Sequence, residues 1–102
     1  MIRHIVLLRF RSDVSIDQRN AIYTDLASLK SVVPGMLSMS YGANVSPEGK
    51  DKGFSDGFSM DFIDEAARDA YLIHPDHQAA GARLVAALDG ERDGLIVFDL
   101  VV

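Results

Sequence analysis

Residues Tyr71-Leu72-Ile73-His74-Pro75-Asp76-His77 contain one phenol and two of the three histidines of this 102-residue chain. Pro75 interrupts a helical pattern, because proline lacks a backbone N–H and disfavours helix in the residue before it. Proline suits the first turn of a new helix, and the negative charge of Asp76 interacts favourably with the positive N-terminal end of the helix dipole. We therefore expect a corner between two helices, with the three rings placed around it.

The two helices beside this corner have recognisable features. Asp64 is a good N-cap for a short helix over residues 65–72. A second helix should run from about residue 76 to residue 88, with small residues at 79–82 that either allow close approach or leave space beside it. The buried positions of the second helix are expected to be Leu84, Val85 and Leu88.

Upstream of the corner, a strand and a long helix are expected. Residues 2–10 are β-branched and almost continuously apolar, which is typical of a strand covered on both faces. Ser15 with Gln18 has the form of a capping box, so a helix should begin there and continue to about residue 32, before Pro34. Its buried stripe is expected to be Ile22, Leu26, Leu29 and Val33, with Tyr23 at the edge.

Three further strands complete the chain. Residues 36–45 form a weaker strand pattern, in which Gly42 indicates a bulge or a close backbone approach. After a polar loop at 46–53, residues 54–62 alternate between apolar and polar, and residues 95–102 are apolar on both faces. The order β-α-β-β-α-β predicts an α+β fold over residues 1–102, one domain with a four-stranded antiparallel sheet and helices on one face.

That arrangement leaves one face of the sheet bare, although the first and last strands look covered on both sides. The simplest solution is a second copy that packs sheet to sheet, so the strand composition predicts a homodimer. The alternative is that Ile5, Leu7 and their neighbours only form an apolar surface.

Composition narrows the classes of function. The net charge is −5 and the ten Lys and Arg residues are scattered, which disfavours nucleic acid and membrane surfaces as partners. The absence of cysteine excludes disulfides, thiolate metal sites and a cysteine nucleophile. The first apolar segment, about seven residues long, is too short for a membrane span and lacks a signal-peptide cleavage site. We therefore expect a cytoplasmic protein.

Several segments, in this order, resemble the stress-responsive A/B barrel domain (Dabb) family. The most specific is the Tyr-x-x-His-Pro-x-His segment, followed by a helix and an apolar strand that ends in Phe-Asp. The matching segments are residues 1–10, Val33-Pro34-Gly35, residues 41–46, residues 52–54, Gly57-Phe58, residues 70–78 and Val97-Phe98-Asp99. The resemblance covers nearly the whole chain. It implies a ferredoxin-like protomer and a dimeric α+β barrel.

The resemblance also implies candidate site residues. One branch of the family is a polyketide cyclase that uses the tyrosine and the second histidine of this segment, near a first-strand histidine. The corresponding residues here are Tyr71, His77 and His4. Those cyclases have bulky aromatic residues in the last helix, whereas this chain has alanines. The alanines are Ala79, Ala80, Ala82, Ala86 and Ala87.

Tyr71 and His77 have the chemistry for carbonyl substrates. An unperturbed histidine titrates at roughly 6.5, so it can accept or donate a proton, and a tyrosine hydroxyl can bind a developing oxyanion. The pair would support proton abstraction next to a carbonyl and aldol-type closure without a cofactor. The alternative is structural: Tyr71 packs at the core edge and His77 caps or packs the next helix.

The remaining candidates line a pocket. His4 should face the helices with Val6 and Leu8, at the mouth of an internal cavity; the alternative is a strand-end histidine bonded to the backbone. We expect His4, Val6, Leu8, Tyr23, Phe58 and His74 to bind the ligand. His74 and His77 lie three apart, but Pro75 breaks the helix between them, so we expect no metal site, and His74 should close the turn before Pro75. The chain has no cofactor fingerprint, so we expect no cofactor.

Three hypotheses of function follow. The first is a homodimeric A/B barrel protein with a small-molecule pocket between sheet and helices. The second is a cofactor-independent cyclase, isomerase or lyase acting on a polyketide-like carbonyl substrate, with His77 as base and Tyr71 as oxyanion donor. The third, a monooxygenase, rests on fold analogy alone.

Overall fold

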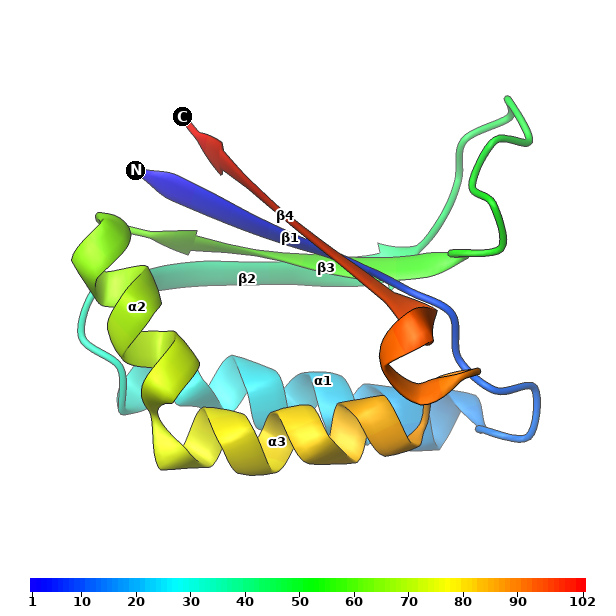
Figure 1. The fold of residues 1–102 in the computed structure, drawn as a ribbon, viewed down its shortest axis with the longest axis horizontal. Coiled ribbons are helices and arrows are strands. Elements are labelled where there is room, and N and C mark those ends of the chain that lie inside the picture. The colour runs from blue at the N-terminus through cyan, green and yellow to red at the C-terminus, as the bar shows by residue number, and fades with distance from the viewer.

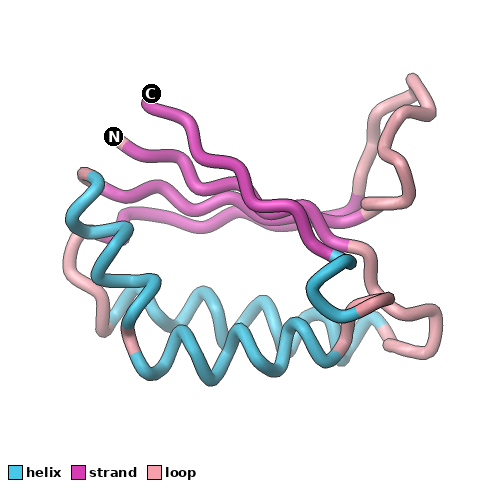
Figure 2. Tube along the Cα trace, viewed as in Figure 1, coloured by secondary structure: helices cyan, strands magenta, loops and turns pink.

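In the computed structural model, which describes residues 1–102, three helices lie against one face of a four-stranded sheet (Figures 1 and 2). The sheet order is β2-β3-β1-β4, and all neighbouring strands are antiparallel. The elements are β1 (Ile2–Leu8), α1 (Ile16–Ser28), η1 (Leu29–Ser31), β2 (Met36–Ala43), β3 (Asp56–Phe62), α2 (Glu65–Ile73), α3 (Pro75–Ala86), η2 (Glu91–Gly94) and β4 (Leu95–Val101). This is the predicted ferredoxin-like fold.

The helices begin where the sequence predicts. The Ser15 side chain accepts from the Gln18 N–H at 3.1 Å, and the Ser15 N–H donates to Gln18 Oε1 at 2.8 Å, which completes the capping box. Asp64 accepts the N–H of Ala67 at the start of α2. These contacts use side chains within three residues of the backbone groups they satisfy, which is why the local sequence was sufficient to predict them.

The core lies between the helices and one face of the sheet. Every second residue of β1, beginning with Ile2, is buried there, so this strand turns His4, Val6 and Leu8 toward the helices. Tyr23 is only 3% exposed, so its predicted place at the edge of the helical stripe was wrong. Its ring packs edge-on to Phe10 and Phe58 and is covered by a stacked Tyr41 ring.

The predicted role of Gly42 was also wrong. The bulge of β2 lies between Met36 and Ser38, and no atom of the chain lies within 4 Å of where a Cβ on Gly42 would be. The close backbone approach occurs across the sheet at Gly57, where a Cβ would lie 2.9 Å from the Val6 carbonyl oxygen. A serine, alanine or larger residue at Gly57 would force β1 and β3 apart.

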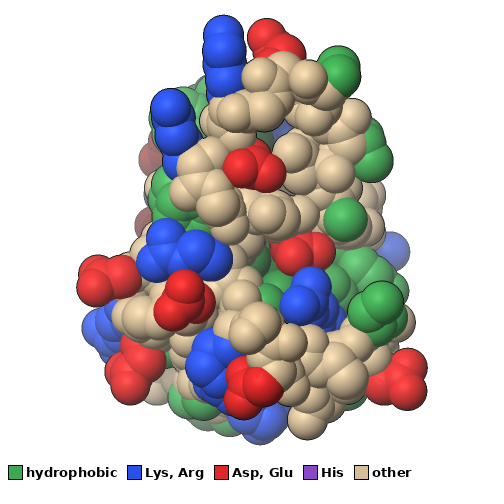
Figure 3. Space-filling model, turned by 90° about the vertical axis from the view of Figure 1, so that its right-hand side faces the viewer, with side chains coloured by type: hydrophobic (Ala, Val, Ile, Leu, Met, Phe, Trp, Pro, Cys, Tyr) green, Lys and Arg blue, Asp and Glu red, His purple; other side chains and the backbone are tan.

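Residues 44–55 form a long loop that rises from the end of β2 and β3, away from the helices (Figures 1 and 2). Figure 3 views the molecule from this end, where acidic and basic side chains are interspersed rather than segregated. Arg9, which follows β1, contacts this loop, because its guanidinium lies over the Phe54 ring, 5.2 Å from the ring centre. None of the helices has the length and apolar character needed to cross a membrane.

Candidate functional site

Three polar rings from three elements meet at one end of the core. His4 comes from β1, Tyr71 from the last turn of α2, and His77 from the first turn of α3. The ring centres of Tyr71 and His77 are 4.1 Å apart, and those of His4 and Tyr71 are 5.9 Å apart. The ring of Phe62 on β3 packs against the same cluster, with its centre 5.1 Å from the centre of the Tyr71 ring. The structure thus brings the three implied site residues into one cluster.

The turn at Pro75, between α2 and α3, brings Tyr71 and His77 together. His74 ends α2 in an extended conformation, and its Nδ1 accepts the Asp76 N–H at 3.1 Å, so His74 is the N-cap of α3. Pro75 is the first residue of α3, where its missing N–H costs nothing. The chain therefore turns between Tyr71 and His77, and two residues on successive helices face each other.

The His77 ring has a defined tautomer. Its Nδ1 lies 3.1 Å from the Leu72 carbonyl oxygen, which only accepts, so the proton is on Nδ1 and Nε2 is left with a free lone pair. A Cβ at Gly81 would lie 3.9 Å from this Nε2, so the glycine leaves open space beside it. Burial lowers the pKa of His77, and the nearby His4 and His74 lower it further. The hydrogen bond to the Leu72 carbonyl raises the pKa, but burial outweighs it. The ring is therefore neutral at pH 7.

Tyr71 complements this base with a donor. The residue is 1% exposed, and burial raises the pKa of its hydroxyl well above the ordinary value of 10.0. The phenol therefore keeps its proton throughout the physiological range. A protonated hydroxyl next to a neutral imidazole gives the cluster one hydrogen-bond donor and one proton acceptor.

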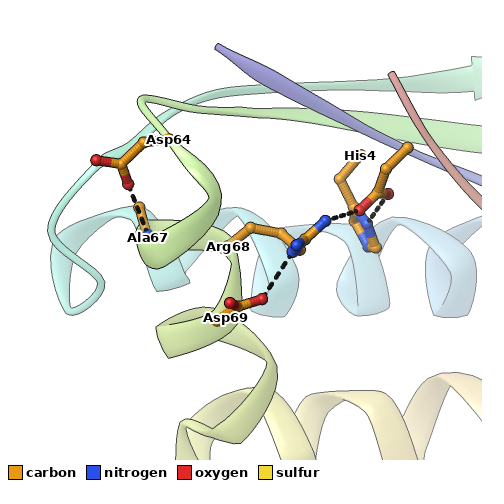
Figure 4. Close-up of polar contacts among 6 residues, drawn as sticks. His4, Asp64, Ala67, Arg68 and Asp69 are labelled. Carbon is orange, nitrogen blue, oxygen red and sulfur yellow. Dashed lines mark hydrogen bonds and ion pairs between the residues drawn. The ribbon is translucent and has the colours of Figure 1, made fainter. Parts of the chain in front are cut away.

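His4 is oriented by a chain of charged groups. Its Nδ1 lies 2.7 Å from Asp99 Oδ1 of β4, and the other carboxylate oxygen of Asp99 lies 2.7 Å from Arg68 of α2. Figure 4 shows Arg68 reaching from its helix toward the His4 ring. Burial raises the pKa of Asp99, but the hydrogen bonds from Arg68 and His4 outweigh it, and the pKa is lowered. The carboxylate thus stays ionised and holds the His4 ring in place.

The other predicted pocket residues do not all join this cluster. Val6 and Leu8 are buried on the same face of β1 as His4. Tyr23 and Phe58 belong to a second aromatic group with Phe10 and Tyr41, and no ring contact connects the two groups. The Tyr23 hydroxyl is buried without a partner in the protein, and burial raises the pKa of Tyr23 to about 12.

Sequence reasoning missed Asp99 and Arg68 as parts of the site. Asp99 had a signal, because it is the one charged residue in an otherwise apolar strand. Arg68 lies three residues before Tyr71 on the same helix, so helical spacing places the two side chains on one face. Nowhere in the chain do three or more His, Cys, Asp or Glu side chains gather in a way that could hold a metal ion.

Solved structures of other proteins have closely similar folds. A dimeric ferredoxin-like protein of unknown function from Jannaschia sp. CCS1 is 36% identical, with a TM-score of 0.90 over 99% of this chain and 98% of that chain. A hydroxynitrile lyase from Passiflora edulis is 22% identical, with a TM-score of 0.86 over 99% of this chain and 92% of that chain. At 22% identity the likeness concerns the fold alone.

Two further comparisons concern sequence. Olivetolic acid cyclase of Cannabis sativa is 22% identical over 80 residues, which are 78% of this chain and 79% of the cyclase. The profile of the family described as Stress responsive A/B Barrel Domain matches residues 2–102. The match spans every strand and helix described above, and the chain therefore belongs to the Stress responsive A/B Barrel Domain (Dabb) family.

Proposed function

We propose that this Dabb protein is a homodimer that binds a small carbonyl-containing molecule in a pocket between sheet and helices, at His4, Tyr71 and His77. The observation that carries the proposal is that a neutral imidazole and a protonated phenol lie together at the edge of an apolar core, with their ring centres 4.1 Å apart. A carbonyl oxygen would accept from the Tyr71 hydroxyl, and the apolar remainder of the ligand would contact core side chains.

Similarity to other proteins supports both parts of the proposal. The Jannaschia structure is described as dimeric, and one of the sequence relatives is named as a cyclase. Strand β4 supports the homodimer independently, because Phe98 on its outer face is 57% exposed in the single chain. Leu7 and Ile96 on the same face are 40% and 42% exposed, so the three side chains form an apolar patch, and such a patch is typical of a surface buried by a partner.

The binding proposal is tested by titrating the protein with 2-heptanone, a simple methyl ketone, and following the histidine ring signals by ¹H–¹⁵N NMR. The signals of His77 and His4 should shift with saturation, and Tyr71→Phe should weaken binding by about tenfold, the value of one hydrogen bond. Tyr41→Phe is the matched control, since that phenol lies in the other aromatic group. Ring signals that stay unchanged at millimolar ketone would contradict the proposal for this ligand class.

The contact between the Tyr71 and His77 rings, which leaves His77 Nε2 with a free lone pair, favours a second candidate, a cofactor-independent cyclase, isomerase or lyase. In its cyclase form, His77 Nε2 takes a proton from the carbon next to a carbonyl, and Tyr71 donates to the resulting enolate oxygen. The enolate carbon then bonds to a second carbonyl carbon of the same molecule. The proton held by His77 passes to the new alkoxide, so the ring closes without loss of atoms.

The first of these steps can be measured alone. The protein in D₂O should catalyse deuterium incorporation next to the carbonyl of 2-heptanone, observed by the loss of the ¹H signal. Replacing the base in His77→Ala should slow exchange by about 10²–10⁴-fold, the usual contribution of a general base. If His77→Ala exchanges at the rate of the unaltered protein while its circular dichroism is unchanged, His77 is not the base.

A further inference from the structure

Tyr23 and Tyr41 form a stacked pair of phenols that the proposed ligand site does not use. Tyr23 comes from α1 and Tyr41 from the edge strand β2, and their ring centres are 4.4 Å apart with an angle of 16° between the ring planes. Facing carbons of rings stacked in this way lie at about van der Waals distance, roughly 3.5–4.0 Å. A helix and an edge strand are thus in contact through two rings of the same chemistry.

The composition of the chain makes its tyrosines the side chains most easily oxidised by one electron. Cysteine and tryptophan, which compete with tyrosine for one-electron oxidants, are both absent. Of the three tyrosines, Tyr71 and Tyr23 are 1% and 3% exposed, whereas Tyr41 is 49% exposed. A one-electron oxidant in solution should therefore react first at Tyr41, which loses its phenolic proton to water and becomes a phenoxyl radical.

Tyr23 is held in place beneath this exposed ring. Its ring packs edge-on to Phe10 and Phe58, and its hydroxyl is sealed from solvent without a hydrogen-bond partner in the protein. After burial, the charge of Asp56 is the strongest influence that raises the pKa of Tyr23. An oxidised phenol is a strong acid, so the Asp56 carboxylate can accept the proton that Tyr23 loses on oxidation. Because the Asp56 side chain is 15% exposed, it can pass this proton to water.

We propose that Tyr23 and Tyr41 are the site of an intramolecular dityrosine crosslink, formed when a peroxidase and hydrogen peroxide oxidise this protein. The unpaired electron of a phenoxyl radical occupies the π system of the ring, so two stacked rings are oriented to couple through their faces. A bond forms between one carbon of each ring, ortho to the oxygen, and the hydrogens on these carbons move to the two oxygens. In total the phenols lose two electrons and two protons, which convert one hydrogen peroxide into two water molecules.

The crosslink would stabilise the fold. It joins α1 to β2 and closes the chain between them, which includes η1, into a covalent ring. Such a closure restricts the unfolded chain and thereby favours the folded state, as a disulfide does. The chain has no cysteine, so the crosslink would be its first covalent connection between elements. Oxidation at this pair should therefore raise the unfolding midpoint of the protein.

Treatment of the dilute protein with a haem peroxidase and hydrogen peroxide tests the proposal. Denaturing electrophoresis should show a single chain with the blue fluorescence of dityrosine, and its intact mass should be lower by two hydrogen atoms. Tyr23→Phe and Tyr41→Phe should each lose this product. Tyr71→Phe is the matched control and should still form it, because the aromatic neighbours of Tyr71 are His4, Phe62 and His77.

The variants keep the test decisive. Tyr23→Phe removes only a hydroxyl that has no partner in the protein, so it should fold, and circular dichroism checks this. Covalent dimers in place of a crosslinked single chain would show that Tyr41 couples between molecules, and would overturn the proposal. Hydroxylation of Tyr41 without a crosslink would also overturn it, as would a fluorescent single chain in folded Tyr23→Phe. None of these outcomes depends on the carbonyl ligand proposed above.

Discussion

The three histidines of this chain have three different environments, although their intrinsic chemistry is the same. His4 is 5% exposed and is bonded to a carboxylate, His74 caps a helix, and His77 contacts a buried phenol. Only His77 has a ring nitrogen with a free lone pair beside open space. The candidate base is thus distinguished by its surroundings and not by its residue type.

His77 should make the stability of the protein depend on pH. Burial holds its pKa below the ordinary 6.5, so the unfolded chain binds this proton more readily than the folded chain. The free energy of unfolding should therefore decrease as the pH falls below 6.5 toward the folded-state pKa. Urea unfolding at about pH 7.5 and 5.5 should show a smaller decrease for His77→Gln than for the unaltered protein. Equal decreases in both proteins would contradict the assignment.

Asp99→Asn should destabilise the fold by about 1–3 kcal/mol, because a buried His4 N–H loses its charged acceptor. Asp69→Asn is the matched control, since Asp69 also bonds Arg68, but its side chain is 66% exposed. Chemical denaturation should therefore show a clear change for Asp99→Asn and little change for Asp69→Asn. Similar effects of the two substitutions would show that the His4 contact is not important for stability.

At the scale of elements, the corner between α2 and α3 depends on the His74 cap. His74→Ala removes the acceptor for the Asp76 N–H and should cost about 1 kcal/mol, the usual value of an N-cap. His74→Asn provides another good capping side chain and should retain most of the stability. Thermal unfolding of the two variants distinguishes the cap from other roles of the imidazole, because only the alanine variant should be weakened.

Gly81 in α3 should be replaceable with a gain in stability. Glycine within a helix costs about 0.5–1 kcal/mol relative to alanine, and nothing lies closer than 3.9 Å to the new methyl group. Gly81→Ala should therefore raise the unfolding midpoint. Because that nearest atom is His77 Nε2, the same variant should weaken ketone binding if the open space beside this nitrogen is used by the ligand. A stabilised variant with unchanged binding would place the ligand elsewhere.

Elements whose signals are local were predictable, and contacts between distant elements were not. Ser15 and Asp64 begin their helices as expected, because a cap is formed within three residues. The contact of His4 with Asp99 joins residues 95 positions apart and depends on the register between β1 and β4. Gly42 was misassigned for a related reason: the sequence shows both strand glycines, but it does not show that Gly57, and not Gly42, lies against the backbone of β1.

At the scale of the whole molecule, the proposed homodimer connects folding to association. A dimer that forms only from folded chains stabilises the folded state by mass action. The unfolding midpoint should therefore rise with protein concentration for the unaltered chain, measured by calorimetry over about a hundredfold range. A concentration-independent midpoint for the unaltered protein would indicate that the chain forms no dimer.

The chain ends lie side by side, since the Val102 N–H donates to the Met1 carbonyl oxygen at 2.9 Å (Figure 1). A short glycine linker could join them without disturbing β1 or β4, and new ends could be opened in the exposed loop at Gly49. Such a circular permutant would keep every strand pairing and both aromatic groups. It would also interrupt the loop at residues 44–55, so that the contribution of an unbroken loop to stability could be separated from that of the sheet.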